Sequence, residues 1–241
     1  MRTRIVALIG ALLVSSVACS TLFGSSDEQP TLPSGGSSGG ASTSAASTSA
    51  PQVATQIVSG VLLKDDFSDP STGWEVGDYD TGSVGYQGGS YSVVSLGNGD
   101  TMWGIASQDF GDVVIEVTAE QVSGPANDNN DYGVMCRIQE SNDGYFLLIS
   151  GDGYYAILKR ADDQFENLVD WTPSDAINTG DSQNQIQAVC DGSSLALIVN
   201  GQQVATASDS DFSHGDIALT ATSYESDSTE VLFDNFAVRQ P

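Results

Sequence analysis

The side chains that most often carry out catalysis are scarce in this chain of 241 residues. Its one histidine, His214, lies in the loop-like sequence DFSHGD, so we expect neither a Ser-His-Asp triad nor a histidine-based zinc site. Carboxylates are abundant, with 32 acidic residues against 7 basic ones. Retaining glycoside hydrolysis needs two carboxylates about 5 Å apart, and the sequence leaves open whether any pair converges. We therefore assign no catalytic residue from the sequence.

A second group of chemically capable side chains comes from residues 131–160, which read as three β-strands joined by two short loops. Pairing Glu140 with Tyr145, and placing a tight turn at Asp152–Gly153, sorts the side chains onto two faces, because side chains alternate along a strand. The apolar face is expected to be core: Val134, Cys136, Ile138, Tyr145, Leu147, Ile149, Tyr154, Ala156 and Leu158. The mixed face carries aromatic rings beside cations and an amide: Met135, Arg137, Gln139, Phe146, Leu148, Ser150, Tyr155, Ile157 and Lys159.

The elements that must position this segment are β-strands from about Val61 to Gln240. Short β-rich runs recur there between turn signals, and the strongest is Asn200-Gly201, a two-residue turn of the kind that closes a hairpin. No segment shows helical periodicity over three turns, and no internal repeat is visible. The pattern predicts an all-β fold, one antiparallel sandwich or barrel.

Two of the three cysteines lie in this β-rich part, Cys136 and Cys190. Cys190 ends the run 184–191 on the same face as Ile186 and Ala188, and Cys136 belongs to the core face described above. Both thiols are therefore expected to point inward. In an exported protein this favours a disulfide, and the alternative is two separately buried thiols.

Residues 1–18 resemble a bacterial secretory signal, with Arg2 and Arg4 before a short apolar run. Val17-Ala18-Cys19-Ser20 is similar to a lipobox, which predicts lipidation of Cys19, although Ser16 stands where an aliphatic residue is usual. The alternative is ordinary cleavage after Ala18. We expect an exported protein held at a bacterial cell surface or envelope by lipid, or else a secreted one. Residues 19–60, rich in Ser, Thr, Gly and Ala, predict a disordered tether before a domain at 61–241.

The formal net charge of −25 disfavours nucleic acid and anionic lipid as direct partners. An acidic surface suits calcium or a salty, mineral-rich exterior. The simpler interpretation is solubility, because acidic runs usually face water. The acidic loop 127–131 (NDNND) lacks the spacing of an EF-hand, and we expect it to be solvated.

Several pieces, in order along the chain, resemble the concanavalin A-like lectin/glucanase superfamily. They are Asp65-Asp66-Phe67-Ser68, Gly73-Trp74, Tyr132-Gly133-Val134, Gly153-Tyr154-Tyr155, Val199-Asn200-Gly201, Gly215-Asp216-Ile217-Ala218-Leu219 and Phe233-Asp234-Asn235-Phe236. The order is similar to exported LamG-like or 3-keto-disaccharide-hydrolase-like domains and covers roughly residues 62–241. The resemblance implies a two-sheet antiparallel jelly-roll sandwich. The Glu-x-Asp-x-Glu motif of its laminarinase branch is incomplete here, since Glu116 and Glu120 lack the middle Asp.

The resemblance also implies where a ligand would bind, because carbohydrate in this superfamily commonly lies on the concave sheet. On this chain the implied ligand-binding residues are Arg137, Gln139, Phe146, Tyr155, Lys159 and Trp171. The rings would stack on sugars and the polar groups would bond hydroxyls or a carboxylate. The alternative is that the apolar members pack beneath a covering loop and Trp171 anchors the core.

Calcium is the one cofactor that the resemblance implies, near the chain ends. Asp66 and Asp234 would meet there if the terminal strands are neighbours. The alternative is that each carboxylate caps a strand end. Together these features predict a carbohydrate-binding or surface-interaction module without catalysis, whose partner is a glycan or cell-envelope polysaccharide. The alternatives are a glycoside-cleaving enzyme and a structural envelope protein.

Overall fold

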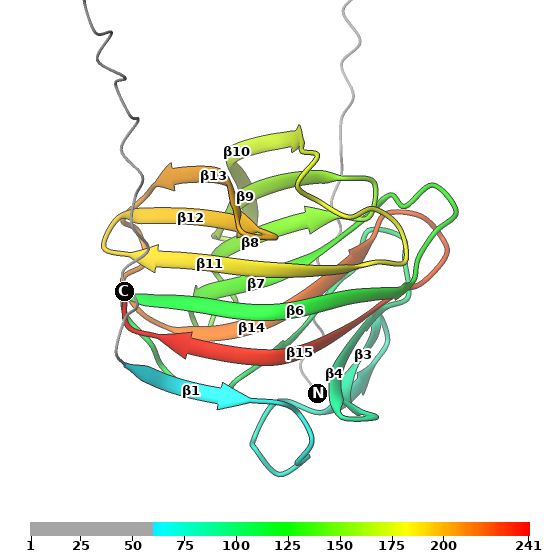
Figure 1. Ribbon diagram of the computed structural model, residues 1–241, viewed down its shortest axis with the longest axis horizontal. Helices are drawn as coiled ribbons and strands as arrows, with labels where there is room; N and C mark the ends of the chain where they lie inside the picture. Colours follow the sequence, from blue (N-terminus) through cyan, green and yellow to red (C-terminus); the bar gives the residue numbers. More distant parts are fainter. Residues whose placement is uncertain (1–59) are drawn as a thin grey trace, which may run out of the picture. The chain divides into compact units, whose positions relative to one another are not determined.

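The computed structural model describes residues 60–241, and the signal, most of the tether and Cys19 lie outside them. The described part consists of strands and loops, and none of its segments is a helix that could span a membrane. Figure 1 shows two packed antiparallel sheets. The larger contains β1 (Val61–Asp65), β2 (Gly77–Tyr79), β3 (Gly82–Gln87), β4 (Ser90–Ser95), β6 (Val113–Ser123), β11 (Gln183–Asp191), β12 (Ser194–Val199), β13 (Gln202–Ser208) and β15 (Thr229–Arg239). The smaller contains β5 (Thr101–Ile105), β7 (Asn130–Ile138), β8 (Gly144–Ser150), β9 (Tyr154–Ala161), β10 (Gln164–Pro173) and β14 (Asp216–Ser223).

The strand order is that of a two-layer sandwich with crossing connections. The nine-stranded sheet runs β13-β12-β11-β6-β15-β4-β3-β2, with β1 paired to β15, and the six-stranded sheet runs β10-β9-β8-β7-β14-β5. Consecutive strands form hairpins at both ends of the nine-stranded sheet and at the β10 end of the six-stranded sheet. Strand β14, by contrast, pairs with β7 and β5, which are far from it in sequence. The predicted all-β, two-sheet antiparallel jelly-roll sandwich is confirmed.

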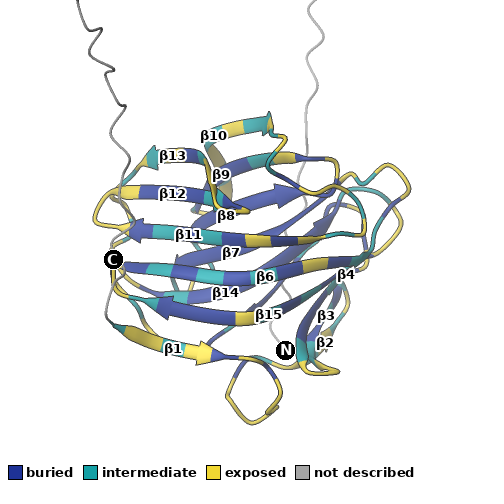
Figure 2. Cartoon of the chain, in the orientation of Figure 1, coloured by how far each residue is buried: buried dark blue, intermediate teal, exposed yellow. Residues whose placement is uncertain are grey.

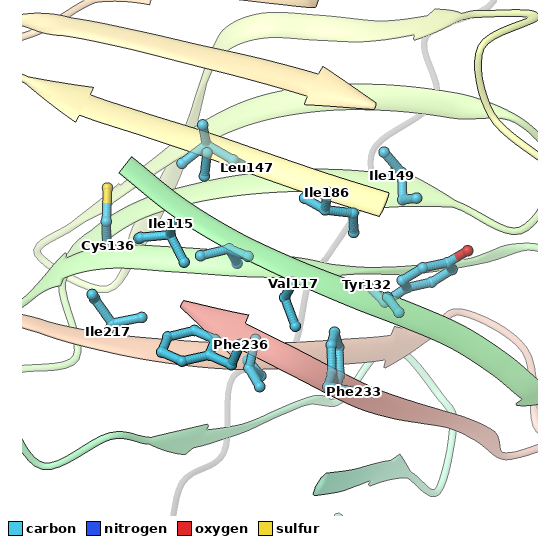
Figure 3. Packing of buried hydrophobic residues seen from close by; sticks show 14 of the residues in the cluster. Ile115, Val117, Tyr132, Cys136, Leu147, Ile149, Ile186, Ile217, Phe233 and Phe236 are labelled. Carbon is cyan, nitrogen blue, oxygen red and sulfur yellow. The ribbon is translucent and has the colours of Figure 1, made fainter. Parts of the chain in front are cut away.

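The main core fills the space between the sheets, as Figure 3 shows for Ile115, Val117 and Phe236 from one sheet and Leu147 and Ile149 from the other. Strand β6 shows why: its Val and Ala residues alternate with Thr and Glu, so one face is buried and the other is not. Strands β7 and β8 differ, because every residue along them is buried (Figure 2). Their outer face must therefore also be covered.

A second apolar cluster covers that outer face of the six-stranded sheet. Its buried members are Trp103, Met135, Ile138, Phe146, Leu148, Ala156, Leu158 and Ala218. The partly buried side chains of Ile105, Phe165 and Trp171 pack against it. The six-stranded sheet is thus apolar on both faces, which an alternating pattern alone does not predict.

The register of the meander differs from the predicted one. Val134 pairs with Leu147, and Cys136 with Tyr145, so β8 is displaced by four residues from the predicted register and keeps its faces. Ile149 pairs with Tyr155, so the loop between β8 and β9 has three residues, 151–153, one more than the two-residue turn expected. The longer loop exchanges the faces of β9. Ala156 and Leu158 lie on the outer face. Tyr155 and Ile157 lie between the sheets, and Lys159 is paired with Tyr145 on the same inner side.

A β-bulge at Arg137 changes the end of β7. Arg137 has a φ of 56°, and the pairing with β14 shifts between Asp216 and Ala218. Beyond the bulge Ile138 joins the outer cluster, so its predicted place in the core was wrong.

The disulfide prediction is confirmed. Cys136 on β7 is bonded to Cys190 on β11, 54 residues apart in sequence, and both are fully buried. Because the two strands belong to different sheets, the bond links the two layers covalently. A loop of this length corresponds to a stabilisation of about 4 kcal/mol in the chain-entropy model.

Candidate functional site

A cavity of about 60 Å³ opens on the outer face of the six-stranded sheet. Its walls come from β5, β7, β8, β9, β10, β14 and the loop after β14: Thr101, Asp131, Phe146, Leu148, Leu158, Phe165, Asn167, Trp171, Thr222 and Tyr224. Strands β5 and β10 are the opposite edges of the sheet, which in a flat sheet lie about 24 Å apart. Residues from both edges line one small cavity, so the sheet curves toward it and this face is the concave one.

The curvature is strongest at β10, which forms one wall of the cavity. Its pairing with β9 is interrupted twice, between Asn167 and Val169 and between Val169 and Thr172. Such irregularities bend and twist an edge strand. Phe165 packs edge-on against Phe146, with ring centroids 5.3 Å apart at 67°, and Trp171 packs on the same apolar cluster. The aromatic wall is therefore fixed from two strands.

The polar end of the cavity is built around Asp131, the second residue of β7. Its side chain is buried at 1% exposure, and Oδ2 accepts a hydrogen bond from the Tyr224 hydroxyl. Oδ1 is buried without a hydrogen-bond partner. Burial raises the pKa of Asp131 to about 6, and the hydrogen bonds of Tyr224 and Thr222 offset only part of this effect. The expectation that the loop 127–131 is solvated was wrong at this end.

Tyr224 is held in place by the other residues of that loop. Its backbone N–H donates to the Asn129 carbonyl at 3.2 Å. The next residue, Glu225, accepts hydrogen bonds from the side-chain amides of Asn127 and Asn129 at 2.9 and 2.8 Å. The Asn-rich loop thus ties down the segment that carries the hydroxyl over Asp131. Burial also raises the pKa of Tyr224, so the phenol is a hydrogen-bond donor at neutral pH.

Two of the six predicted ligand-binding residues, Phe146 and Trp171, line this cavity. Tyr155 lies instead toward the space between the sheets, because the faces of β9 are exchanged. Gln139 lies past the bulge, where its Nε2 donates to the carbonyls of Arg137 and His214 at 2.9 and 2.6 Å.

Arg137 is buried at 1% exposure and joins three loops at one end of the sandwich. Nη1 donates to the carbonyls of Gly192 and Phe212 at 2.7 and 2.9 Å, and Nη2 donates to Asp112 Oδ1 at 2.8 Å. Asp112 also accepts from the Gly192 N–H at 2.9 Å. Arg137 thus holds three loops together through hydrogen bonds, and it does not line the cavity.

Lys159 is surrounded by carboxylates. Its Nζ lies 2.9 Å from Asp209 and from Asp211, and 3.0 Å from Glu166. The hydrogen bond with Asp209, followed by those with Asp211 and Glu166, raises the pKa of Lys159 well above its usual value. Asp209 also accepts from the Tyr145 hydroxyl at 2.6 Å. These groups connect β8 and β9 to the segment after β13 and do not line the cavity.

The terminal strands are neighbours, as the calcium hypothesis required, with Asp65 paired to Phe236. Asp66 accepts hydrogen bonds from the N–H and hydroxyl of Ser68 at 3.1 and 2.6 Å. Asp234 accepts from the N–H of Asn235 at 2.6 Å. Residues 60–241 contain no group of three or more acidic, His or Cys side chains suited to a metal. Calcium at Asp66 and Asp234 stays a prediction.

The one feature of the sequence that could have indicated a buried Asp131 is its position in the chain. It directly precedes Tyr132 in a strand that is apolar on both faces, so solvent is excluded from both sides of it. The contact between Tyr224 and Asp131 depends on β14 lying beside β7, and no local sequence pattern predicts that two strands so far apart in sequence are neighbours.

No family model and no curated protein matches the sequence. Solved structures match the fold. The carbohydrate-binding module CBM66 of Bacillus subtilis is 17% identical, with a TM-score of 0.57, over 70% of this chain and 96% of that one. A β-glucanase of Bacillus licheniformis is 14% identical, with a TM-score of 0.56, over 76% and 99%. A Bacillus subtilis protein of unknown function with a galectin-like fold is 12% identical, with a TM-score of 0.55, over 76% and 97%. The concanavalin A-like fold is confirmed, and at these identities the likeness concerns the fold alone.

Proposed function

We propose that this concanavalin A-like chain is a non-catalytic carbohydrate-binding module that holds a sugar of a glycan against its concave sheet. The observation that carries the proposal is the cavity at Asp131, in which aromatic rings converge with a buried carboxylate that has one oxygen unpartnered. Sugar rings present C–H faces to aromatic side chains and hydroxyls to oriented polar groups. Trp171 and Phe165 supply the first kind of contact, and Asp131 and Asn167 supply the second.

The same cavity supports binding over hydrolysis. Asp131 is the one carboxylate among its lining residues, whereas the common glycosidase mechanisms use two. Glu116 lies on the nine-stranded sheet, where it accepts hydrogen bonds from Gln187 and Arg239, both at 3.0 Å. A glycoside-cleaving enzyme would need a second carboxylate from outside the lining.

The proposal includes the anchor expected from the sequence. Cys19 takes lipid, and the tether 19–60 gives the domain an r.m.s. reach of roughly 35 Å from a membrane or wall layer. The partner is then a glycan or envelope polysaccharide within that distance. A Cys19→Ala chain should appear in the soluble fraction of cells, and its continued fractionation with membranes would contradict the anchor.

A glycan array tests the binding function. The protein is applied with and without Ca²⁺, together with Trp171→Ala and, as a control on the other sheet, Leu62→Ala, whose side chain is 44% exposed on β1. We expect binding by the wild type and by Leu62→Ala, and a loss of at least tenfold for Trp171→Ala. Binding to no glycan, or equal binding by all three proteins, would overturn the proposal, and the first of these results would favour a structural envelope protein. Release of new reducing ends from a bound glycan would instead favour the enzyme.

A further inference from the structure

The cavity on the concave sheet has an uncompensated negative charge. Of its ten lining residues, Asp131 is the one ionisable acid and none is Lys, Arg or His. The nearest polar neighbours do not balance it: Tyr224 donates one hydrogen bond, and the Thr222 hydroxyl, which donates to Thr101 at 3.0 Å, offsets only part of the effect of burial on the Asp131 pKa. A buried carboxylate oxygen without a donor is costly, so a ligand that supplies a donor, above all a cation, gains most there.

The walls around this carboxylate are aromatic. Phe146, Phe165, Trp171 and Tyr224 all line the cavity. The faces of aromatic rings attract cations, Trp most strongly, and the attraction grows when water is excluded. A carboxylate beside several rings is therefore suited to an organic ammonium group.

The size of the cavity restricts what can enter. About 60 Å³ holds a few water molecules or one small substituent, but not a whole sugar ring. A glycan lying on the concave face would therefore insert one substituent between Trp171 and Asp131. An amino group fits this space, whereas an N-acetyl group is larger and carries no charge.

The charge of the whole chain acts in the same direction. A formal net charge of −25 raises the local concentration of cations and disfavours the approach of anions. Uronic acids and sulfated sugars are anionic, so they would be repelled first by the net negative charge of the chain and then by the Asp131 carboxylate.

We propose that the concave cavity recognises an amino sugar whose free ammonium group pairs with the carboxylate of Asp131 among the rings of Phe146, Phe165, Trp171 and Tyr224. The inference rests on the proposed function, and it names the class of glycan that the site takes. Neutral sugars bind the same face more weakly, and acidic sugars are excluded.

The test is calorimetric titration of the full chain with three oligosaccharides of equal length, made of glucosamine, N-acetylglucosamine or glucose. High ionic strength screens the general attraction of an acidic protein for a cationic oligomer. Each oligomer is also titrated into Asp131→Asn and into Asp78→Asn, which removes one charge from an exposed position on β2. Circular dichroism verifies that all three proteins are folded.

We expect the glucosamine oligomer to bind at least tenfold more tightly than the other two. Asp131→Asn should abolish this preference and Asp78→Asn should keep it. Equal affinity for all three oligomers would overturn the amino-sugar inference and leave glycan binding standing. A preference for glucosamine that persists in Asp131→Asn would also overturn it, since it would reflect the acidic surface. Binding of none of them, together with an empty glycan array, would overturn the proposed function as well.

Discussion

The hydroxyl of Tyr224 donates a hydrogen bond to Oδ2 of Asp131, while Oδ1 of the same buried carboxylate has no hydrogen-bond partner. The two residues lie on opposite sides of the β7–β14 pairing, 93 residues apart in sequence. A half-satisfied buried carboxylate destabilises the free protein, and such groups are retained where a ligand completes them. This relationship is why we place the binding site here and not elsewhere on the sheet.

Asp131→Asn should stabilise the protein at neutral pH. The folded-state pKa of Asp131 is raised from 3.8 to about 6, so the folded protein holds its proton more tightly than the unfolded chain does. The protonated carboxyl therefore contributes to the stability of the wild type below about pH 3.8, and this stability is lost as the pH rises through about 6. We expect the variant to gain about 2–4 kcal/mol at pH 7 and little at pH 4. Urea unfolding at several pH values measures the difference.

The control for this prediction is Asp78→Asn, in which an exposed carboxylate is lost. It should not reproduce the pH-dependent gain. A variant Asp131→Asn that is less stable than the wild type at pH 7 would show that the ionised carboxylate is satisfied in the free protein.

Tyr224→Phe should raise the pKa of Asp131 further. The hydrogen bond from Tyr224 lowers that pKa in the wild type, so its loss leaves desolvation less opposed. Carboxyl carbon chemical shifts followed by NMR across pH 4–8 report the midpoint. A midpoint at or below that of the wild type would contradict the arrangement of the two side chains.

Arg137→Met should reduce stability and leave glycan affinity unchanged. The guanidinium supports two loop carbonyls and Asp112 while buried at 1% exposure, and its loss should lower the free energy of unfolding by roughly 2–4 kcal/mol. Arg239→Met is the matched control, because Arg239 is partly exposed and pairs with Glu116, and it should cost less than about 1 kcal/mol. Loss of glycan binding by a folded Arg137→Met variant would show that Arg137 contributes to the binding site, as predicted from the sequence.

Loss of the disulfide should destabilise the sandwich and leave the concave face functional. Cys136→Ala with Cys190→Ala should lower the free energy of unfolding by about 2–4 kcal/mol, because the bond joins the two sheets. Denaturant unfolding measures the change, and a glycan titration of the folded variant measures function. An unchanged midpoint would mean that the bond contributes little, and weakened binding would mean that the concave sheet depends on it.

The sequence predicted the fold because its signals were local and repeated. Alternation in β6, the Asn200-Gly201 turn and the inward-facing Cys136 and Cys190 each specify structure over a few residues. The site was less predictable, because it depended on one loop length and one bulge. The three-residue loop at 151–153 turned Tyr155 and Lys159 inward, and the bulge at Arg137 displaced the end of β7. Phe146 and Trp171 line the concave cavity because β8 shifted by an even number of residues and the pairing of β10 with β9 is irregular.

The most direct test of the account is an NMR titration that follows the indole N–H resonances of the tryptophans as glycan is added. Trp171 lines the concave cavity, and Trp74 lies buried in the core between the sheets, so the second is an internal control. The account predicts a saturable shift of the Trp171 resonance, which for an amino-sugar oligomer needs a higher ligand concentration in Asp131→Asn, with Trp74 unmoved. A bound glycan that leaves Trp171 unshifted would contradict the central claim that the concave cavity is the binding site.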